Sequence, residues 1–236
     1  MFKVSVITTL YNYKNYIGEC IKSFLKQDFI DSEMVIVDDA SRDNPYDVIK
    51  KYESDRIHYI RLDSNKGYSY AKNIGIKACK SEILVMLDAD DMLVKNGISI
   101  RYKKLMKDYD FVHGPCLDFK DKRPLVRNRL WDLWLKNPTW KYVHAQGAML
   151  KKEIHRKIGL YDETLRCKSD REFFARVFNH NFKVGIVKKD VALYRRHKKQ
   201  MHRSKEKIKI NDKLQKEVLN KIEKRKKNLS GLNFLK

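Results

Sequence analysis

Cysteines are few in this sequence, and long apolar segments are absent. The four cysteines are scattered, without the spacing of a metal site or a redox pair, at Cys20, Cys79, Cys116 and Cys167. We therefore expect reduced thiols, as in a cytoplasmic protein, and neither a disulfide framework nor a zinc site. No apolar run approaches the roughly 18 residues that a membrane-spanning helix needs. Residues 1–7 are typical of a strand rather than of a secretory signal, so we expect no signal peptide.

Positive charge is in excess, but only in the second half of the chain. The 236 residues include 52 Lys and Arg against 30 Asp and Glu, a formal net charge of +22. Residues 1–100 hold 14 basic and 15 acidic residues, residues 101–194 hold 22 and 11, and residues 195–236 hold 16 and 4. This asymmetry favours a polyanion or an anionic surface as the partner of the second half.

The first half alternates between strand and helix patterns. A hydrophobic content of 42% is ample for a core. Apolar, often β-branched runs predict strands at 4–9, 34–37, 57–60 and 83–87, with helical patterns between them. This alternation predicts an α/β fold with a mostly parallel, Rossmann-like sheet flanked by helices, and ligands at the carboxyl ends of its strands.

Aspartates follow two of these strands where the strands end. They are Asp38, Asp39, Asp88, Asp90 and Asp91. Mutual repulsion makes such neighbours costly unless a cation or hydrogen-bond donors compensate. Mg²⁺ and Mn²⁺ prefer carboxylate oxygens and often bridge a protein to a diphosphate, so residues 88–91 are candidate ligands for one of these cations. The alternative is a solvated acidic turn, or a cap for a helix that begins near Lys95.

The pattern is less regular after about residue 110. Strands are predicted at 110–114, 147–150, 183–187 and 191–194, and helices at 151–157 and 169–179. Three tryptophans lie close together in the chain, at Trp131, Trp134 and Trp140. They form either a stacking platform, for an acceptor sugar or an extruded nucleobase, or a helix face buried in the core.

A lysine-rich segment at 204–227 has apolar residues at near-helical spacing. They are Ile208, Leu214, Val218 and Ile222. The pattern predicts a basic amphipathic helix within a C-terminal extension over residues 204–236. Three interpretations are open: the helix lies on an anionic bilayer, it follows the phosphates of a nucleic acid, or it packs on the domain or on a second subunit.

Four motifs in order resemble those of family-2 glycosyltransferases, which have the GT-A fold. They are residues 4–12, 35–41, 65–75 and 86–91, with weaker similarity at 159–163, 169–172 and 194–197. The resemblance implies a GT-A domain over residues 1–203, with a nucleotide-binding half at 1–100 and an acceptor half at 101–203. It also implies an enzyme that uses Mn²⁺ or Mg²⁺ and transfers a sugar, with inversion, from a nucleotide-diphosphate donor, foremost a UDP-sugar, to a hydroxyl acceptor.

The resemblance also assigns residues to the nucleotide. Thr9 and Tyr11 match positions that contact the base, and Tyr11 could stack on a uracil-like ring. Asp39 matches the carboxylate that accepts a hydrogen bond from the base, and Lys72 matches a basic residue near the nucleotide. An aromatic face for a base and a carboxylate for its N–H group are chemically coherent choices.

Further residues match the part of the family's site around the diphosphate. Asp88 and Asp90 match the carboxylates that serve ribose and metal, and Asp91 adjoins the donor sugar. Arg195 could complement phosphate charge, and His197 could bind phosphate or metal. The alternative for Arg195 and His197 is that they are the first cations of a solvated basic tail.

Asp170 is the candidate catalytic base. Inverting transfer needs one carboxylate that takes the proton of the acceptor hydroxyl as its oxygen attacks the anomeric carbon. Residues 169–172 also match a capping box, with Ser169 as N-cap and Glu172 as the third helical residue. Both roles are compatible at the start of a helix.

The charge asymmetry bears on the acceptor. We expect an anionic or membrane-associated glycan, or a lipid-linked acceptor, and a cytoplasmic enzyme that associates peripherally with the inner membrane surface. Two alternatives remain: a glycosyltransferase that acts on modified DNA bases, and a noncatalytic nucleic-acid-binding module on a decayed transferase fold. Steep salt dependence of nucleic-acid binding without nucleotide binding would favour the module.

Overall fold

The computed structural model describes residues 2–120, 123–127, 143–165, 168–198, 200 and 220, with the backbone alone at 123–127. The predictions for Trp131, Trp134 and Trp140 lie outside the described residues, as does the predicted basic helix at 204–227 except for Asn220. Cys20, Cys79 and Cys116 are free and buried.

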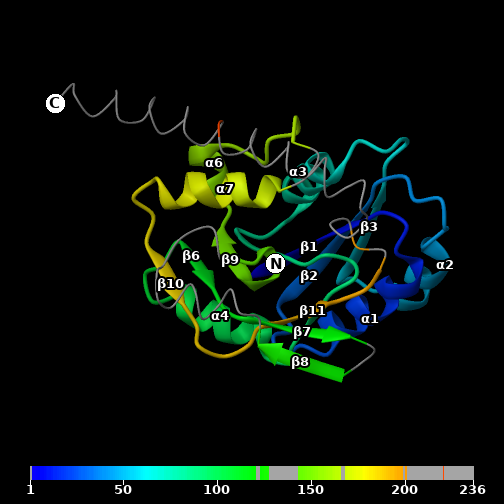
Figure 1. The fold of residues 1–236 in the computed structure, drawn as a ribbon, viewed down its shortest axis with the longest axis horizontal. Coiled ribbons are helices and arrows are strands. Elements are labelled where there is room, and N and C mark those ends of the chain that lie inside the picture. The colour runs from blue at the N-terminus through cyan, green and yellow to red at the C-terminus, as the bar shows by residue number, and fades with distance from the viewer. Residues whose placement is uncertain are drawn as a thin grey trace.

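A seven-stranded sheet forms the centre of the fold (Figure 1). Its strands follow the order β10-β6-β9-β4-β1-β2-β3. Neighbouring strands are parallel, except that β9 runs antiparallel to β4 and β6. The predicted α/β fold with a mostly parallel sheet is therefore confirmed. The strands are β1 (Val4–Leu10), β2 (Ser32–Asp38), β3 (Ile57–Arg61), β4 (Ile83–Met86), β6 (Phe111–His113), β9 (Ala148–Lys151) and β10 (Val184–Ile186).

Helices cover both faces of this sheet (Figure 1). One face is packed by α1 (Lys14–Leu25) and α4 (Gly97–Leu105). The other is packed by α3 (Tyr68–Ala78), α6 (Glu153–Ile158) and α7 (Ser169–Phe178). Shorter elements are α2 (Tyr46–Ile49) and the 3₁₀ turns η1 (Lys50–Tyr52) and η3 (Ala145–Gly147). Among the described helices, none has both the length and the apolar character to cross a bilayer.

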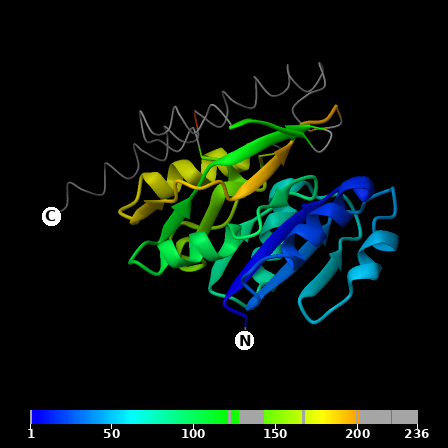
Figure 2. The same ribbon diagram turned by 90° about the horizontal axis from the view of Figure 1, so that it is seen from below.

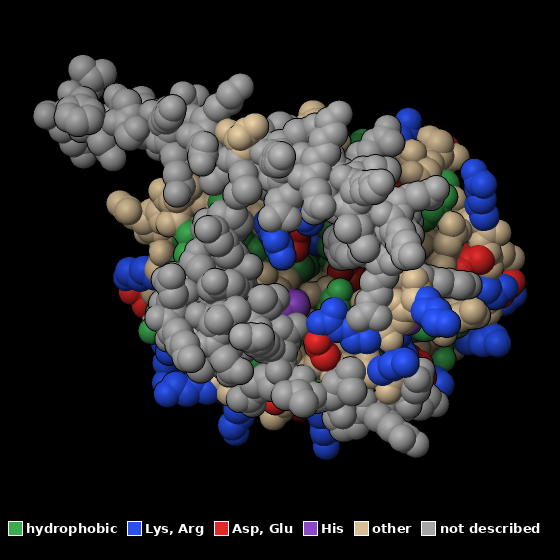
Figure 3. All heavy atoms as spheres, viewed as in Figure 1, with side chains coloured by type: hydrophobic (Ala, Val, Ile, Leu, Met, Phe, Trp, Pro, Cys, Tyr) green, Lys and Arg blue, Asp and Glu red, His purple; other side chains and the backbone are tan. Residues whose placement is uncertain are grey.

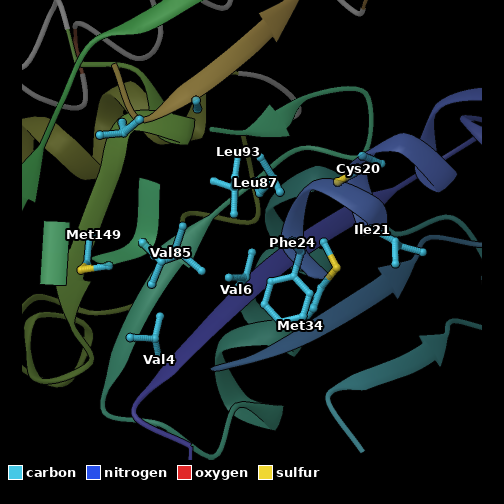
Figure 4. Packing of buried hydrophobic residues seen from close by; sticks show 14 of the residues in the cluster. Val4, Val6, Cys20, Ile21, Phe24, Met34, Val85, Leu87, Leu93 and Met149 are labelled. Atoms are coloured by element: carbon cyan, nitrogen blue, oxygen red, sulfur yellow. The ribbon is translucent and has the colours of Figure 1, made fainter. Parts of the chain in front are cut away.

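Strand β1 shows why both faces are covered. All seven of its residues are buried. Val4 and Val6 lie in the cluster that includes Phe24 of α1 (Figure 4), whereas Ile7 packs on the side of α3. This alternation follows from the two-residue period of a strand. A run of β-branched apolar residues is therefore what a central, fully buried parallel strand requires.

Helix α3 approaches the sheet closely at Gly75. A Cβ atom there would come within 2.5 Å of Cγ2 of Ile7, so any larger residue would push the helix away from β1. At the other end of the same helix, the backbone N–H of Gly67 reaches the carboxylate of Asp39, which follows β2. The close packing thus brings the first turn of α3 to the carboxyl end of the sheet.

A second, four-stranded sheet lies beside the first (Figure 2). Its order is β5-β11-β7-β8, where β5 is Met92–Leu93, β7 is Cys116–Lys120, β8 is Arg123–Arg127 and β11 is Ala192–Arg195. The sequence predicts only β11. In the antiparallel β5–β11 pair, Leu93 lies opposite Ala192 and Met92 opposite Leu193. Continuing that register brings the aspartates before β5 next to the residues that end β11.

Candidate active site

Asp38 ends β2 and Asp39 follows it, but the two carboxylates have different environments. Asp38 is fully buried and accepts hydrogen bonds from the Tyr59 hydroxyl (2.7 Å), from Arg61 and from the Ser41 N–H (2.8 Å). These contacts hold the β2 end to β3. Asp39 instead accepts the N–H groups of Lys66 (2.7 Å) and Gly67 (2.8 Å).

The loop before α3 is shaped around Asp39. Gly67 has φ of +95°, a value that residues with a Cβ atom rarely adopt, and it is the N-cap of α3. Burial raises the pKa of Asp39, and the N–H groups of Lys66 and Gly67 oppose that rise. Each carboxylate oxygen holds one backbone donor, and because an oxygen can accept a second, Asp39 can still bind a ligand N–H.

Asp88 is held from both sides. One oxygen accepts the Tyr68 hydroxyl (2.9 Å) and the other accepts Nε2 of Gln146 (2.7 Å). Burial raises the pKa of Asp88 to about 6, and the charge of Asp90 adds to the rise, whereas Lys72 and Tyr68 oppose it. Sequence reasoning missed both Tyr68 and Gln146. Tyr68 directly follows Gly67 of a recognised motif, which is a usable signal, but Gln146 has none.

The pKa of Asp88 predicts a pH dependence of stability. The pKa of about 6 in the folded protein lies above the ordinary value of 3.8 for Asp, so between these two pH values the folded protein binds the extra proton. The free energy of unfolding therefore falls as the pH rises through that window. In a chelator, we expect calorimetry to show a melting temperature about 2–4 °C higher at pH 5 than at pH 7 from this group, about 1 kcal/mol. Asp88→Asn should lose that increment; an unchanged pH profile in this variant would contradict the assignment.

Lys72 is a buried cation next to the acidic residues. Its side chain is on α3, and Nζ lies 4.1 Å from the centre of the Tyr68 ring and 5.0 Å from that of Tyr161. Burial lowers the pKa of Lys72, while the charges of Asp88 and Asp170 raise it. Among the described residues Nζ has no hydrogen-bond partner, so aromatic faces and nearby carboxylates stabilise the ammonium. An anionic ligand would supply the missing acceptor.

The β5–β11 pair brings His197 to Asp90. Nε2 of His197 lies 2.9 Å from Oδ2 of Asp90, and the imidazole packs at 4.5 Å from the Tyr16 ring and 5.6 Å from the Tyr13 ring. Asp91 accepts the backbone N–H of Arg195 at 2.8 Å. Burial and the charges of Asp90 and Asp88 raise the pKa of Asp91.

Asp90 and His197 fit a divalent cation that also binds phosphate. Among the described residues, no group of three or more His, Cys, Asp or Glu side chains could hold a metal ion. Mg²⁺, however, is commonly bound by one or two carboxylates, water and substrate phosphates rather than by a protein cage. The adjacent Oδ2 of Asp90 and Nε2 of His197 would supply two protein ligands for such a partial site. The buried Oδ2 of Asp91, without a partner in the described part of the chain, is a further acceptor nearby.

Arg195 connects several elements around this partial site. It is 8% exposed. Its Nε donates to the carbonyl of Asp90 at 2.8 Å, and its guanidinium pairs with Glu19 of α1. The same group lies 4.5 Å from the Phe119 ring of β7. These contacts position the chain on which His197 lies. Phosphate binding by Arg195 stays a prediction.

Asp170 lies in the first turn of α7, but the predicted capping box is wrong. The N-cap is Lys168, with φ of +57° and no side-chain capping bond. Ser169 Oγ is buried without a partner in the described residues, and Glu172 pairs with Arg176 at 3.0 Å. Glu172 therefore turns inward, where its ion pair with Arg176 outweighs a contact with the helix end.

Asp170 lies close enough to several residues of this region for its charge to act on them. Its charge acts on Lys72, Tyr68 and Tyr161, and also on the imidazole of His144. The fold thus brings Asp170 into the same charged environment as Asp88 and Lys72.

The carboxyl end of β1 lies at the same edge of the sheet as these residues. Thr9 is 8% exposed, whereas Tyr11 is 39% exposed. Asn12 links the β1 and β2 ends, since its N–H donates to Ser41 Oγ at 2.9 Å and its side chain accepts the Arg42 N–H at 2.8 Å. Figure 3 shows a hollow near the centre of one face, where acidic, basic and histidine side chains come together.

The chain belongs to glycosyl transferase family 2, whose family model matches residues 5–197. It is 32% identical over 121 residues to glycosyltransferase GlyG of Streptococcus pneumoniae, a match that covers 50% of this chain and 40% of that protein. It is 33% identical over 124 residues to the GalNAc(5)-diNAcBac-PP-undecaprenol beta-1,3-glucosyltransferase of Campylobacter jejuni, which covers 51% of this chain and 40% of that enzyme.

Solved structures confirm the GT-A fold. TarS 1–349 of S. aureus in complex with UDP matches with a TM-score of 0.72 at 21% identity, over 84% of this chain and 61% of that one. Mannosyltransferase PcManGT of Pyrobaculum calidifontis, with GDP-Man and Mn²⁺, matches with a TM-score of 0.70 at 19% identity, over 85% and 59%. The chain thus spans less than two thirds of each of these proteins. The nucleic-acid alternatives gain no support from them.

Proposed function

We propose that this chain is a metal-dependent, inverting glycosyltransferase that takes a sugar from a UDP-sugar and transfers it to the hydroxyl group of an anionic, lipid-linked glycan acceptor. The observation that carries the proposal is the convergence, at one edge of the sheet, of Asp39, Asp88, Lys72, the Asp90–His197 pair and Asp170. Family membership supports a nucleotide-sugar donor.

In this proposal the β1 and β2 ends bind the nucleoside. Tyr11 stacks on the base, next to Thr9, and Asp39 accepts the base N–H group. Uracil offers one such donor between two carbonyl groups, so a single carboxylate suits it. Asp88 accepts a ribose hydroxyl. The preformed loop around Asp39 reduces the ordering cost that nucleotide binding would otherwise carry.

The diphosphate lies against the cationic and metal-binding groups. Asp90 and His197 would hold the divalent cation, and Lys72, buried and without an acceptor in the described residues, faces the phosphates. Bound Mn²⁺ or Mg²⁺ would neutralise charge on the departing nucleoside diphosphate. Asp91 lies at the donor sugar. Arg195 keeps the chain of His197 in place and contributes positive charge.

Asp170 acts as the general base. It accepts the proton of the acceptor hydroxyl while the oxygen attacks the anomeric carbon from the face opposite the leaving group. One displacement of this kind inverts the anomeric configuration.

The acceptor is proposed from charge and from relatives. All of the excess positive charge lies beyond residue 100. The Campylobacter relative acts, by its name, on a glycan carried by a polyprenyl diphosphate. An acceptor of that chemistry would place the enzyme at an anionic membrane surface. Liposome flotation of the chain with and without residues 204–236 tests this part.

Donor binding tests the central proposal. Titration calorimetry should detect UDP binding with a Kd of about 1 µM to 1 mM in the presence of Mn²⁺, and weaker binding in a chelator. Slow hydrolysis of a UDP-sugar with release of UDP should accompany it. GDP and ADP are the matched control ligands. Equal affinity for all three would contradict the UDP assignment, and binding of none would contradict the proposed function.

A further inference from the structure

Gln146 lies next to Asp88 because of the register between β4 and β9. In this antiparallel pair Val85 lies opposite Met149 and Leu84 opposite Leu150. Continuing the register by three residues toward the carboxyl end of β4 brings Gln146 opposite Asp88. The Gln146 amide then donates to Oδ2 of Asp88 at 2.7 Å. Gln146 is 3% exposed, so its side chain has few alternative positions.

The turn η3 that carries Gln146 is tightly packed. A Cβ atom on Gly147 would come within 2.4 Å of the carbonyl oxygen of Gly114, and the Gly114 N–H donates to the Gly147 carbonyl at 3.1 Å. The turn therefore fits against the end of β6 only with glycine at this position. This contact fixes one side of the turn.

Arg101 of α4 fixes the other side. Nη1 of Arg101 donates to the carbonyl groups of Gln146 (2.9 Å) and Ala148 (3.1 Å), and Nε donates to that of Gly97 (2.8 Å). Arg101 is fully buried, and burial lowers its pKa to about 10. No carboxylate pairs with it among the described residues. Burying a cation without a counter-ion costs free energy. The hydrogen bonds of Arg101 to the carbonyl groups around η3 offset this cost, and they indicate that Arg101 stabilises this turn.

We propose that Gln146 is a positioning residue that orients Asp88 for the nucleotide of the donor, and that Arg101 acts through Gln146 by holding η3. The proposal rests on the proposed function, because it takes the ligand of Asp88 to be the nucleotide. Tyr68 and Gln146, which lie on different elements, each donate a hydrogen bond to one oxygen of Asp88. The orientation of the carboxylate is therefore fixed before a ligand binds. Without Gln146 the carboxylate can rotate away from its productive orientation.

UDP affinity in the presence of Mn²⁺ tests the role of Gln146. Gln146→Met keeps the size of the side chain but removes the donor, and it should weaken UDP binding about 10-fold, as expected for loss of a hydrogen bond to a charged group. Gln146→Glu replaces the donor by a like charge and should weaken it more. In donor hydrolysis, KM should rise while kcat changes little. Wild-type UDP affinity in folded Gln146→Met would overturn the proposal.

Gln27→Met is the matched control for loss of a buried amide. Gln27 is 5% exposed, and within the described part of the chain the hydrogen bonds of its amide go to backbone groups of Ser23, Val94 and Ile98. This variant should lose thermal stability but keep UDP affinity. If its affinity falls as much as that of Gln146→Met, the effect of Gln146 is one of general stability and the proposal fails.

A double-mutant cycle tests the order of action. Arg101→Lys should weaken UDP binding about 3-fold in the wild-type background but not in the Gln146→Met background, because Arg101 acts through Gln146. Equal losses in both backgrounds would overturn the role of Arg101. A wild-type protein that binds no UDP contradicts the proposed function, and the inference then falls with it. Normal wild-type binding with unaffected Gln146 variants contradicts only the inference.

Discussion

Asp170→Asn should lower the rate of sugar transfer by about 10²–10⁴-fold while leaving UDP affinity close to that of the wild type. Asparagine keeps the size of the side chain but cannot accept the acceptor proton, so the attack of the hydroxyl oxygen loses its base. The effect should fall on kcat, because the donor is held by other residues. Single-turnover transfer to a hydroxyl acceptor, with Mn²⁺ and a UDP-sugar, is the measurement.

Glu153→Gln is the matched control for this change. Glu153 is an acid in the first turn of α6, as Asp170 is in the first turn of α7, but it is exposed and pairs with Lys157. This control should transfer at the wild-type rate. Retained turnover in Asp170→Asn would remove Asp170 from the role of base. A large loss of UDP affinity in that variant would instead assign it to donor binding.

Asp90→Ala should abolish the dependence of UDP affinity on Mn²⁺ and should lower transfer by about 10²–10³-fold, which matches the several kcal/mol that a metal ion contributes to charge stabilisation. The variant removes the carboxylate that lies beside His197. Of the two proposed ligands, only His197 would then remain to bind the cation. Calorimetric titration of UDP at several Mn²⁺ concentrations measures the linkage.

Stability has to be followed in the same variant. The contact between Asp90 and His197 also joins the end of β11 to the loop after β4, so Asp90→Ala should melt at a lower temperature than the wild type. Asp47→Ala, which removes a partly exposed carboxylate paired with Lys14 and Lys50, is the control for loss of one negative charge. Metal-dependent UDP binding that survives in folded Asp90→Ala would contradict the metal site.

Local patterns predict much of the central sheet, for a physical reason. A strand buried on both faces favours apolar and β-branched residues, and these dominate β1, β2 and β4, so the positions of the three strands follow from residues close together in the chain. The second sheet has no such signature. Strand β5 consists of two residues, and its pairing with β11 joins segments about a hundred residues apart.

The residues of the candidate site also fall into those that local sequence patterns predict and those that they do not. Asp39, Asp88 and Asp90 are predictable because each follows a recognisable strand, and strand ends of a parallel sheet meet at one edge. The prediction of a capping box at Ser169 is wrong because Glu172 forms a buried ion pair with Arg176 instead of a contact with the start of the helix. The orientation of Glu172 depends on the residues that surround it in the folded protein, and a local sequence pattern does not contain that information.

Sequence alone determined the α/β fold, the family and the acidic strand ends, because all of these depend on short-range periodicity and on ordered motifs. Only the tertiary structure decided which side chains contact the aspartates at these strand ends. Gln146 reaches Asp88 through the register of β9, and His197 reaches Asp90 through the pairing of β11. Such contacts depend on how distant strands align, and that alignment is set by the packing of the whole sheet.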